Sequence, residues 1–135
     1  MKHIMAAIDG SECSYRALEH AAKLARGLKA ELTILIVSLF IVGRKDIYVA
    51  LDKTEIDNML IKAKEIATSA GVPKANILVE KSRDVSFTIV DTAIKNEADL
   101  IVMGASGKGG FKTFLIGSVS KEVLRKSACP VTIVH

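Results

Sequence analysis

Three glycines and a serine near the C-terminus have the residue types and spacing to bind phosphate. Two residues separate Gly104 from Gly107, and nine more precede the Gly117-Ser118 pair. Glycine leaves its backbone N–H group uncovered by a side chain, and a helix beginning at Ser118 would direct its positive dipole end toward the same anion. We therefore predict a phosphate-binding loop, with tight turns after a strand as the alternative role of these glycines.

Asp9 is the second candidate, because it follows the apolar run His3–Ile8 and precedes Gly10-Ser11. A carboxylate there could accept hydrogen bonds from ligand hydroxyls or help to hold a metal ion bound to phosphate. An Asp followed by Gly and Ser is also suited to capping a helix N-terminus. The position at the end of a strand favours the ligand.

The sequence shows no catalytic set. Lys108 is followed by Gly109, so the Gly-Lys-Ser/Thr run of P-loop enzymes is absent. The three histidines lack the spacing of metal ligands, and Cys13 and Cys129 form no C-x-x-C motif. We expect a binding protein that is not an enzyme, with slow hydrolysis or transfer of a phosphate group left open.

Alternating β-prone runs and amphipathic stretches must position these residues. The predicted strands are short and mostly apolar on both faces: His3–Ile8, Glu31–Val37, Asn76–Lys81, Asp99–Met103 and Val131–Val134. Helical spacing of apolar residues predicts helices between them, with inward faces that include Phe87, Val90, Ala93 and Ile94 in the third. Asp52 and Glu55 are placed like a capping box at the start of the second helix. We interpret residues 38–51 as a loop.

This alternation predicts one α/β domain over residues 1–135, Rossmann-like, with a parallel five-stranded sheet in the order 3-2-1-4-5 and helices on both faces. Ligands of such sheets bind beyond the carboxyl ends of the strands where the order reverses, here between strands one and four. Asp9 and the glycine-rich loop meet at that point.

The charge balance excludes some partners. There are 19 basic and 15 acidic side chains, which gives a net charge of +4, but they are interspersed. Nucleic-acid binding normally requires a clustered basic face, so we expect no nucleic-acid partner. The longest apolar stretch, Leu32–Val42, is shorter than the ~20 residues that span a bilayer. We expect a cytoplasmic protein with no membrane segment.

Gly104-x2-Gly107-x9-Gly117-Ser118 resembles the ATP-binding signature of the universal stress protein (UspA) family. The stretches "IMAAIDGSECSYRALEHA", "ADLIVMGASGKGG" and "GSVSKEVLRKSACPVTIV" are similar to that family's first, fourth and fifth units. Two segments depart from the usual pattern, "LIVS" at the end of strand two and "RDVSF" after strand three. Neither affects the phosphate glycines.

The resemblance implies an ATP-binding regulatory module of the stress response, with Mg²⁺ held mainly by the phosphates of ATP. Asp9 would contact ligand hydroxyls or the metal, Ser38 would meet the adenine edge through its main chain, and Met103 would line the pocket. The implied nucleotide-binding residues are Ala7, Ile8, Asp9, Ser38, Met103, Gly104, Ser106, Gly107, Gly117, Ser118 and Val119. A nucleotide-free module that binds a protein partner is the remaining alternative.

Strand five would lie at an edge of the predicted sheet, and its sequence is apolar and β-prone. An uncovered edge of this kind pairs readily with another chain. Antiparallel pairing with the same strand of a second copy would satisfy both edges, and the family resemblance implies the same kind of homodimer. The residues involved are Val131, Thr132, Ile133 and Val134. A regulatory protein partner is also expected.

Overall fold

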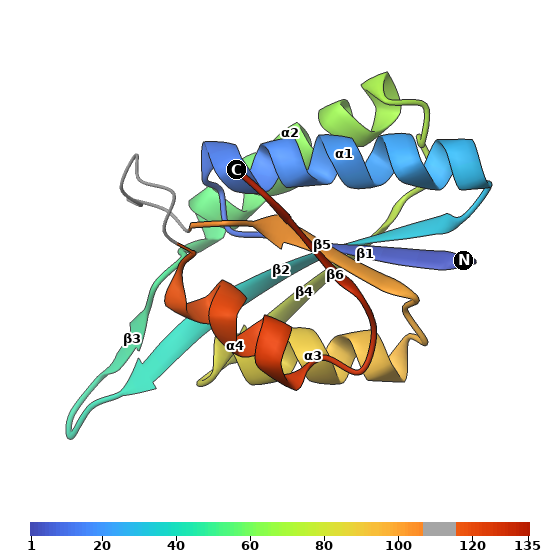
Figure 1. Cartoon of the computed structure of the whole chain (residues 1–135). Helices are drawn as coiled ribbons and strands as arrows, with labels where there is room; N and C mark the ends of the chain where they lie inside the picture. Colours follow the sequence, from blue (N-terminus) through green and yellow to red (C-terminus); the bar gives the residue numbers. More distant parts are fainter. Residues whose placement is uncertain (107–115) are drawn as a thin grey trace.

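Five parallel strands form the centre of the protein, in a computed structural model that describes residues 1–106 and 116–135. They are β1 (His3–Ile8), β2 (Glu31–Val42), β4 (Asn76–Ser82), β5 (Leu100–Gly104) and β6 (Val131–Val134). Their spatial order is β4-β2-β1-β5-β6, which confirms the predicted parallel order. Strands β2 and β4 lie on one side of β1, and β5 and β6 lie on the other, so the expected switch point falls between β1 and β5 (Figure 1).

A sixth strand corrects the prediction that residues 38–51 are a loop and that the sheet has five strands. Strand β2 continues to Val42, and β3 (Ile47–Val49) returns antiparallel beside its end. The turn is closed by the Gly43 N–H, which donates to the Asp46 carbonyl at 2.7 Å. The resulting hairpin projects from the body of the domain (Figure 1). Its apolar, β-branched residues favour a strand, a propensity that the loop interpretation overlooked.

Four helices in the described ranges cover the two faces of the sheet (Figure 1). Helices α1 (Glu12–Leu28) and α2 (Lys53–Ser69) pack on one face, and α3 (Val85–Lys95) and α4 (Ser118–Lys126) on the other. Each face has its own apolar core, so the strands between them are buried on both sides. Within the described ranges, no helix is both long and apolar enough to cross a membrane.

Three of the helices begin at a residue whose side chain accepts a hydrogen bond from the backbone N–H three positions later. These capping residues are Ser11, Asp52 and Asp84. Asp52 confirms the predicted start of the second helix. The N–H of Phe87 and the hydroxyl of Ser86 donate to Asp84, and these bonds hold the pKa of its carboxyl below its usual range.

The predicted inward face of helix α3 is confirmed for two of its four residues. Ala93 is buried and Val90 packs against the core, but the side chains of Phe87 and Ile94 are 60% and 58% exposed and Ile89 is buried instead. Apolar residues surround most of this helix, so its periodicity is weak and packing against β2 and α4 decides the orientation.

Candidate functional site

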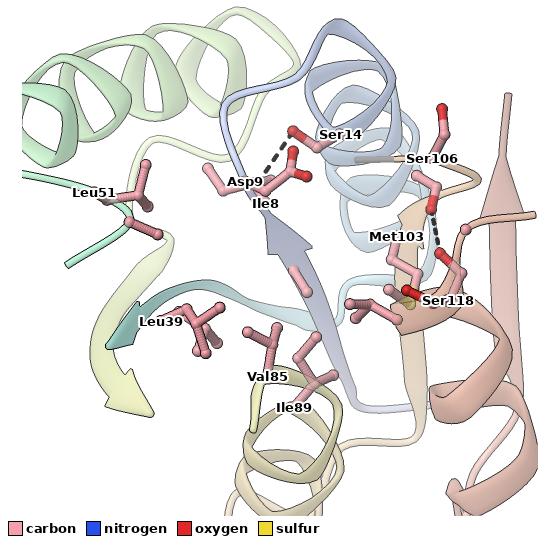
Figure 2. A pocket seen from close by; sticks show the side chains of 17 residues that line it. Ile8, Asp9, Ser14, Leu39, Leu51, Val85, Ile89, Met103, Ser106 and Ser118 are labelled. Atoms are coloured by element: carbon pink, nitrogen blue, oxygen red, sulfur yellow. Dashed lines mark hydrogen bonds between the residues drawn. The ribbon is translucent and has the colours of Figure 1, made fainter. Parts of the chain in front are cut away.

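A cavity of about 370 Å³ opens at the carboxyl ends of β1, β2 and β5, at the predicted switch point. Helices α3 and α4 and the segment before α2 complete its walls (Figure 2). Its size lies in the range of small-molecule sites. The described lining residues are Ala7, Ile8, Asp9, Ser14, Val37, Leu39, Ala50, Leu51, Val85, Ile89, Met103, Gly104, Ser106, Gly117, Ser118, Val119 and Ser120.

One side of the cavity is apolar. Val37 and Leu39 point into it from β2, Leu51 comes from the segment before α2, and Val85 and Ile89 come from the first turns of α3. Figure 2 shows four of these side chains around the same space. A wall of this composition suits a flat apolar ring better than a charged group.

The other side is polar and carries one charged group among the described lining residues, the carboxylate of Asp9. The remaining polar side chains are serine hydroxyls from α1, the loop after β5 and the start of α4: Ser14, Ser106, Ser118 and Ser120. Asp9 lies beside Ser14 at the turn after β1, and Ser106 and Ser118 lie near each other farther along this side (Figure 2). The cavity therefore has distinct apolar and polar ends.

The turn from β1 to α1 holds Asp9 at the cavity. Its Oδ1 accepts a hydrogen bond from the Ser11 N–H at 2.9 Å, and its own N–H donates to the Ser14 Oγ at 3.3 Å (Figure 2). Gly10 between them has φ +89°, a conformation that favours glycine. Ser11 is the residue that caps α1, so the alternative role of Asp9 as the helix cap is wrong.

Helix α4 presents N–H groups without intrahelical acceptors to the polar end. Gly117 occupies the capping position and has no side chain to cap with. The first bond within the helix runs from the Lys121 N–H to the Gly117 carbonyl at 3.0 Å. The N–H groups of Ser118, Val119 and Ser120 therefore have no acceptor within the helix, and all three residues line the cavity. This is the geometry of an anion site at a helix N-terminus.

Hydrogen bonds fix both ends of the glycine-rich loop. The Ala105 N–H donates to the Val134 carbonyl at 2.8 Å and lies 3.2 Å from the acceptor Sγ of Cys13. The Gly117 N–H donates to the Ala105 carbonyl, so this N–H is already bonded within the protein. The Ser120 Oγ donates to the Gly104 carbonyl at 2.8 Å. The start of α4 is thus fixed against the end of β5.

Gly104 packs directly against the first turn of α1. A Cβ at this position would lie 3.0 Å from the Cys13 carbonyl carbon, the Cys13 Sγ and the Ser14 backbone nitrogen. Two of these atoms belong to the backbone of a helix, which cannot move aside without disturbing β1 and β5. Gly104 is therefore needed for close packing of strand against helix, in addition to its place in the cavity wall.

Nine of the eleven residues predicted for the site line the cavity, and the other two differ. Ser38 is buried outside the lining, with its Oγ donating to the Leu51 carbonyl at 3.4 Å, while its neighbours Val37 and Leu39 face the cavity. An adenine contact from its main chain stays a prediction. Gly107 lies outside the described residues.

Eight lining residues were missed by the sequence analysis: Ser14, Val37, Leu39, Ala50, Leu51, Val85, Ile89 and Ser120. Strand alternation could have found Val37 and Leu39, because side chains on either side of Ser38 must share a face. The residues from α3 and from the segment before α2 carry no local signal, since apolar residues there are equally typical of a core.

The chemistry of the site also limits how a metal could be held. In the described ranges, no three His, Cys, Asp or Glu side chains gather where they could bind a metal ion. Asp9 is the one carboxylate in the described lining. A divalent cation here would need most of its ligands from a bound molecule.

The universal stress protein family model matches residues 1–135. The chain belongs to the universal stress protein family. A relative from Methanocaldococcus jannaschii, also a universal stress protein, is 36% identical over 141 aligned residues, which cover 98% of this chain and 81% of the relative. The two proteins therefore align over nearly the whole domain.

Solved structures of the same family share the fold. The universal stress protein UspA from Lactobacillus plantarum superposes with a TM-score of 0.83 at 22% identity, covering 99% of this chain and 97% of the other. A universal stress protein solved in complex with cAMP gives a TM-score of 0.76 at 28% identity, covering 99% and 96%. The α/β fold described above is thus that of the family.

Proposed function

We propose that this member of the family binds ATP in the cavity and acts as a nucleotide-dependent regulatory module in the stress response. The observation that carries the proposal is that the same cavity has an apolar wall at one end and, at the other, Asp9 and the start of α4, which no side chain caps. A nucleotide has the same division, with an apolar base, a ribose with hydroxyls and an anionic tail.

The apolar end would hold the base. Val37, Leu39 and Leu51 offer contact surface, and the described lining there contains no charged group. The relative in complex with cAMP binds an adenine nucleotide with the same fold, which supports adenine as the base. Asp9 would accept hydrogen bonds from the ribose hydroxyls or help to hold the metal.

The phosphates would lie at the start of α4. The N–H groups of Ser118 and Val119 and the hydroxyl of Ser118 are suited to donate to phosphate oxygens. Mg²⁺ fits the site only as a partner of the nucleotide, because it is usually bound through one or two carboxylates plus substrate phosphates. When bound, it would supply positive charge to the phosphates, and Asp9 is the side chain placed to contact it or its waters.

Binding suits the site better than turnover. No histidine, lysine or arginine is among the described lining residues, and Asp9 is already engaged in the turn before α1. Phosphate transfer normally relies on cationic side chains that stabilise charge on the moving group. The nucleotide would instead set the conformation of the surrounding segments. Phosphate release in a single-turnover assay would support the slow ATPase alternative.

Mg-ATP is expected to raise the melting temperature by roughly 5 to 22 °C at a hundredfold excess over Kd. A ligand that binds only the folded state adds about 2.7 kcal/mol at that excess, and each kcal/mol shifts the midpoint by about 2 to 8 °C for domains of this size. GTP is expected to shift it much less, because its ring edge carries more polar groups against the apolar wall. Differential scanning fluorimetry measures both shifts. Equal shifts with ATP and GTP would refute adenine recognition.

We also propose a homodimer through the outer edge of β6, a strand that pairs with β5 alone among the described strands. The Ile101 N–H donates to the Pro130 carbonyl and the Ala105 N–H to the Val134 carbonyl. In a parallel pair, every second residue of a strand directs its N–H and C=O groups to the neighbouring strand. Pro130 and Val134 both bond to β5, so Thr132, midway between them, also directs its backbone groups to β5. The backbone groups of Val131 and Ile133 face the open edge. Antiparallel pairing with a second copy would use these two residues.

Ile133→Pro is expected to convert the dimer to a monomer in sedimentation velocity, because it removes an N–H that faces the edge while the bonds between β5 and β6 remain. Ile133→Ala is the matched control, since it shortens the same half-buried side chain but keeps the N–H, and it should stay dimeric. A wild-type protein that sediments as a monomer at about tens of micromolar would refute the dimer.

A further inference from the structure

The β2–β3 hairpin exposes several large apolar side chains. Five of its side chains are at least half exposed: Ile41 (59%), Val42 (51%), Ile47 (67%), Tyr48 (61%) and Val49 (51%). They lie on an arm that projects away from the helices (Figure 1). A contiguous apolar patch on a folded domain usually marks an interaction surface.

Both faces of the hairpin are apolar. Val42 pairs with Ile47 and Ile41 pairs with Tyr48 in the antiparallel register. Because side chains alternate between faces along a strand, these two cross-strand pairs lie on opposite sides. In the described part of the chain β3 pairs with β2 alone, so its outer edge is also open. The hairpin can therefore accept another strand and contact it with side chains from either face.

Positive charge surrounds this apolar surface. Arg44 and Lys45 lie at the hairpin turn, and Lys81 and Arg83 lie at the end of β4 beside the same part of β2. All four are exposed, and the Arg83 guanidinium sits 5.6 Å from the centre of the Phe40 ring. Among the described residues, none of the four forms an ion pair with a carboxylate.

The neighbouring carboxylates in the described ranges offset part of this charge but do not pair with these cations. Asp46 is the only acidic residue in the hairpin turn, which also holds Arg44 and Lys45, so the turn is net positive. Asp52 and Asp84 are ionised, but each faces the backbone N–H groups of the helix that it caps, and alternation along β4 directs Glu80 to the opposite face from Lys81. The tip of the hairpin thus combines exposed apolar side chains with positive charge, and its complement is an apolar segment with acidic residues.

We propose that the hairpin binds an extended segment of another protein in which apolar and acidic side chains alternate, added as a strand to the open edge of β3. Main-chain hydrogen bonds would provide part of the affinity and the flanking cations would select the acidic sequence. A second copy of this chain fits less well, because pairing of two hairpins would bring their cations together. The surface is separate from the nucleotide-contacting side chains, so it does not depend on the proposed function.

A fluorescein-labelled ten-residue peptide in which Val and Ile alternate with Glu and Asp tests the proposal by fluorescence anisotropy. The wild-type protein should bind it with a Kd in the micromolar range. Val42→Thr with Ile47→Thr should weaken binding by about tenfold or more, equivalent to about 1.4 kcal/mol, because threonine keeps the strand propensity but removes apolar contact. Ile61→Ala, which removes an equally exposed side chain on α2, should leave the affinity unchanged.

Charge selection is tested in the same assay. Arg44→Gln with Lys45→Gln should weaken binding about threefold to tenfold and flatten its salt dependence, while Lys64→Gln with Lys74→Gln should have little effect. Far-UV spectra and melting temperatures of all variants confirm folding. The proposal is overturned if the wild type does not bind, if a peptide with lysine in place of the acids binds equally, or if the threonine variant binds like the wild type. Self-association that is lost in the threonine variant would assign the surface to a second copy and overturn it too.

Discussion

Gly117→Asp is expected to lower the affinity for Mg-ATP by about a hundredfold or more without unfolding the protein. Gly117 caps α4 without a side chain, so the N–H groups that follow it remain available at the cavity. An aspartate at this position accepts hydrogen bonds from the N–H groups two or three residues later. It would occupy the Val119 N–H, one of the proposed phosphate donors, and place a negative charge beside the phosphates. A hundredfold loss corresponds to about 2.7 kcal/mol, which isothermal titration calorimetry measures.

Gly117→Asn is the matched control, because asparagine has nearly the same shape and also caps helices but carries no charge. We expect it to weaken binding about tenfold, less than aspartate does. Both variants should melt at or slightly above the wild-type temperature without nucleotide. The backbone at Gly117 has φ −65° and ψ 161°, which any residue adopts, so strain does not confound the comparison. Wild-type affinity in Gly117→Asp would remove the start of α4 from the phosphate site.

Gly104→Ala is expected to lower the stability of the nucleotide-free protein by about 1 to 3 kcal/mol. The new Cβ would lie 3.0 Å from two backbone atoms and one sulfur atom at the start of α1. The helix is fixed there by the Cys13 Sγ, which donates to the Val134 carbonyl at 2.8 Å. At about 2 to 8 °C per kcal/mol, the melting temperature should fall by roughly 2 to 24 °C.

Gly27→Ala provides a control in which the same substitution should raise the stability of the protein. Gly27 lies within α1, and a Cβ there would meet nothing within 4 Å. Alanine favours the helix by about 0.5 to 1 kcal/mol over glycine, so this variant should melt above the wild type. Urea unfolding of both variants separates the two effects. If Gly104→Ala retained wild-type stability, the packing role would be wrong and only a role in ligand contact would remain.

The sequence by itself determined the order of the parallel strands and the place of the cavity at their carboxyl ends. The bounds of β1 and β6 agree with the prediction, and β2, β4 and β5 begin within a residue of it. This part was predictable because apolar runs on both faces require helices on both sides. Asp9 and Gly117 could also be found in advance, because a carboxylate at a strand end and a glycine before a helix are local signals.

Local sequence signals do not distinguish two structures when the same amino-acid composition suits both. Residues 39–42 and 47–49 are apolar enough for a strand but were interpreted as a loop, because their pairing depends on a register that no single segment encodes. The predicted inward face of α3 is wrong at Phe87 and Ile94 for the same kind of reason. Phe87 and Ile89 are both apolar, and contact with β2 and α4 decides which is buried.

Only the tertiary structure decided which residues share the cavity and which strand groups face outward. Leu39, Leu51 and Val85 are far apart along the chain, and the sheet and α3 bring them to one wall. Thr132 and Ile133 are adjacent, yet the ladder with β5 engages the backbone of the first and leaves that of the second at the edge. The sequence determines these outcomes through the summed packing of the whole domain, because burial and hydrogen bonding at each position depend on segments distant in the chain.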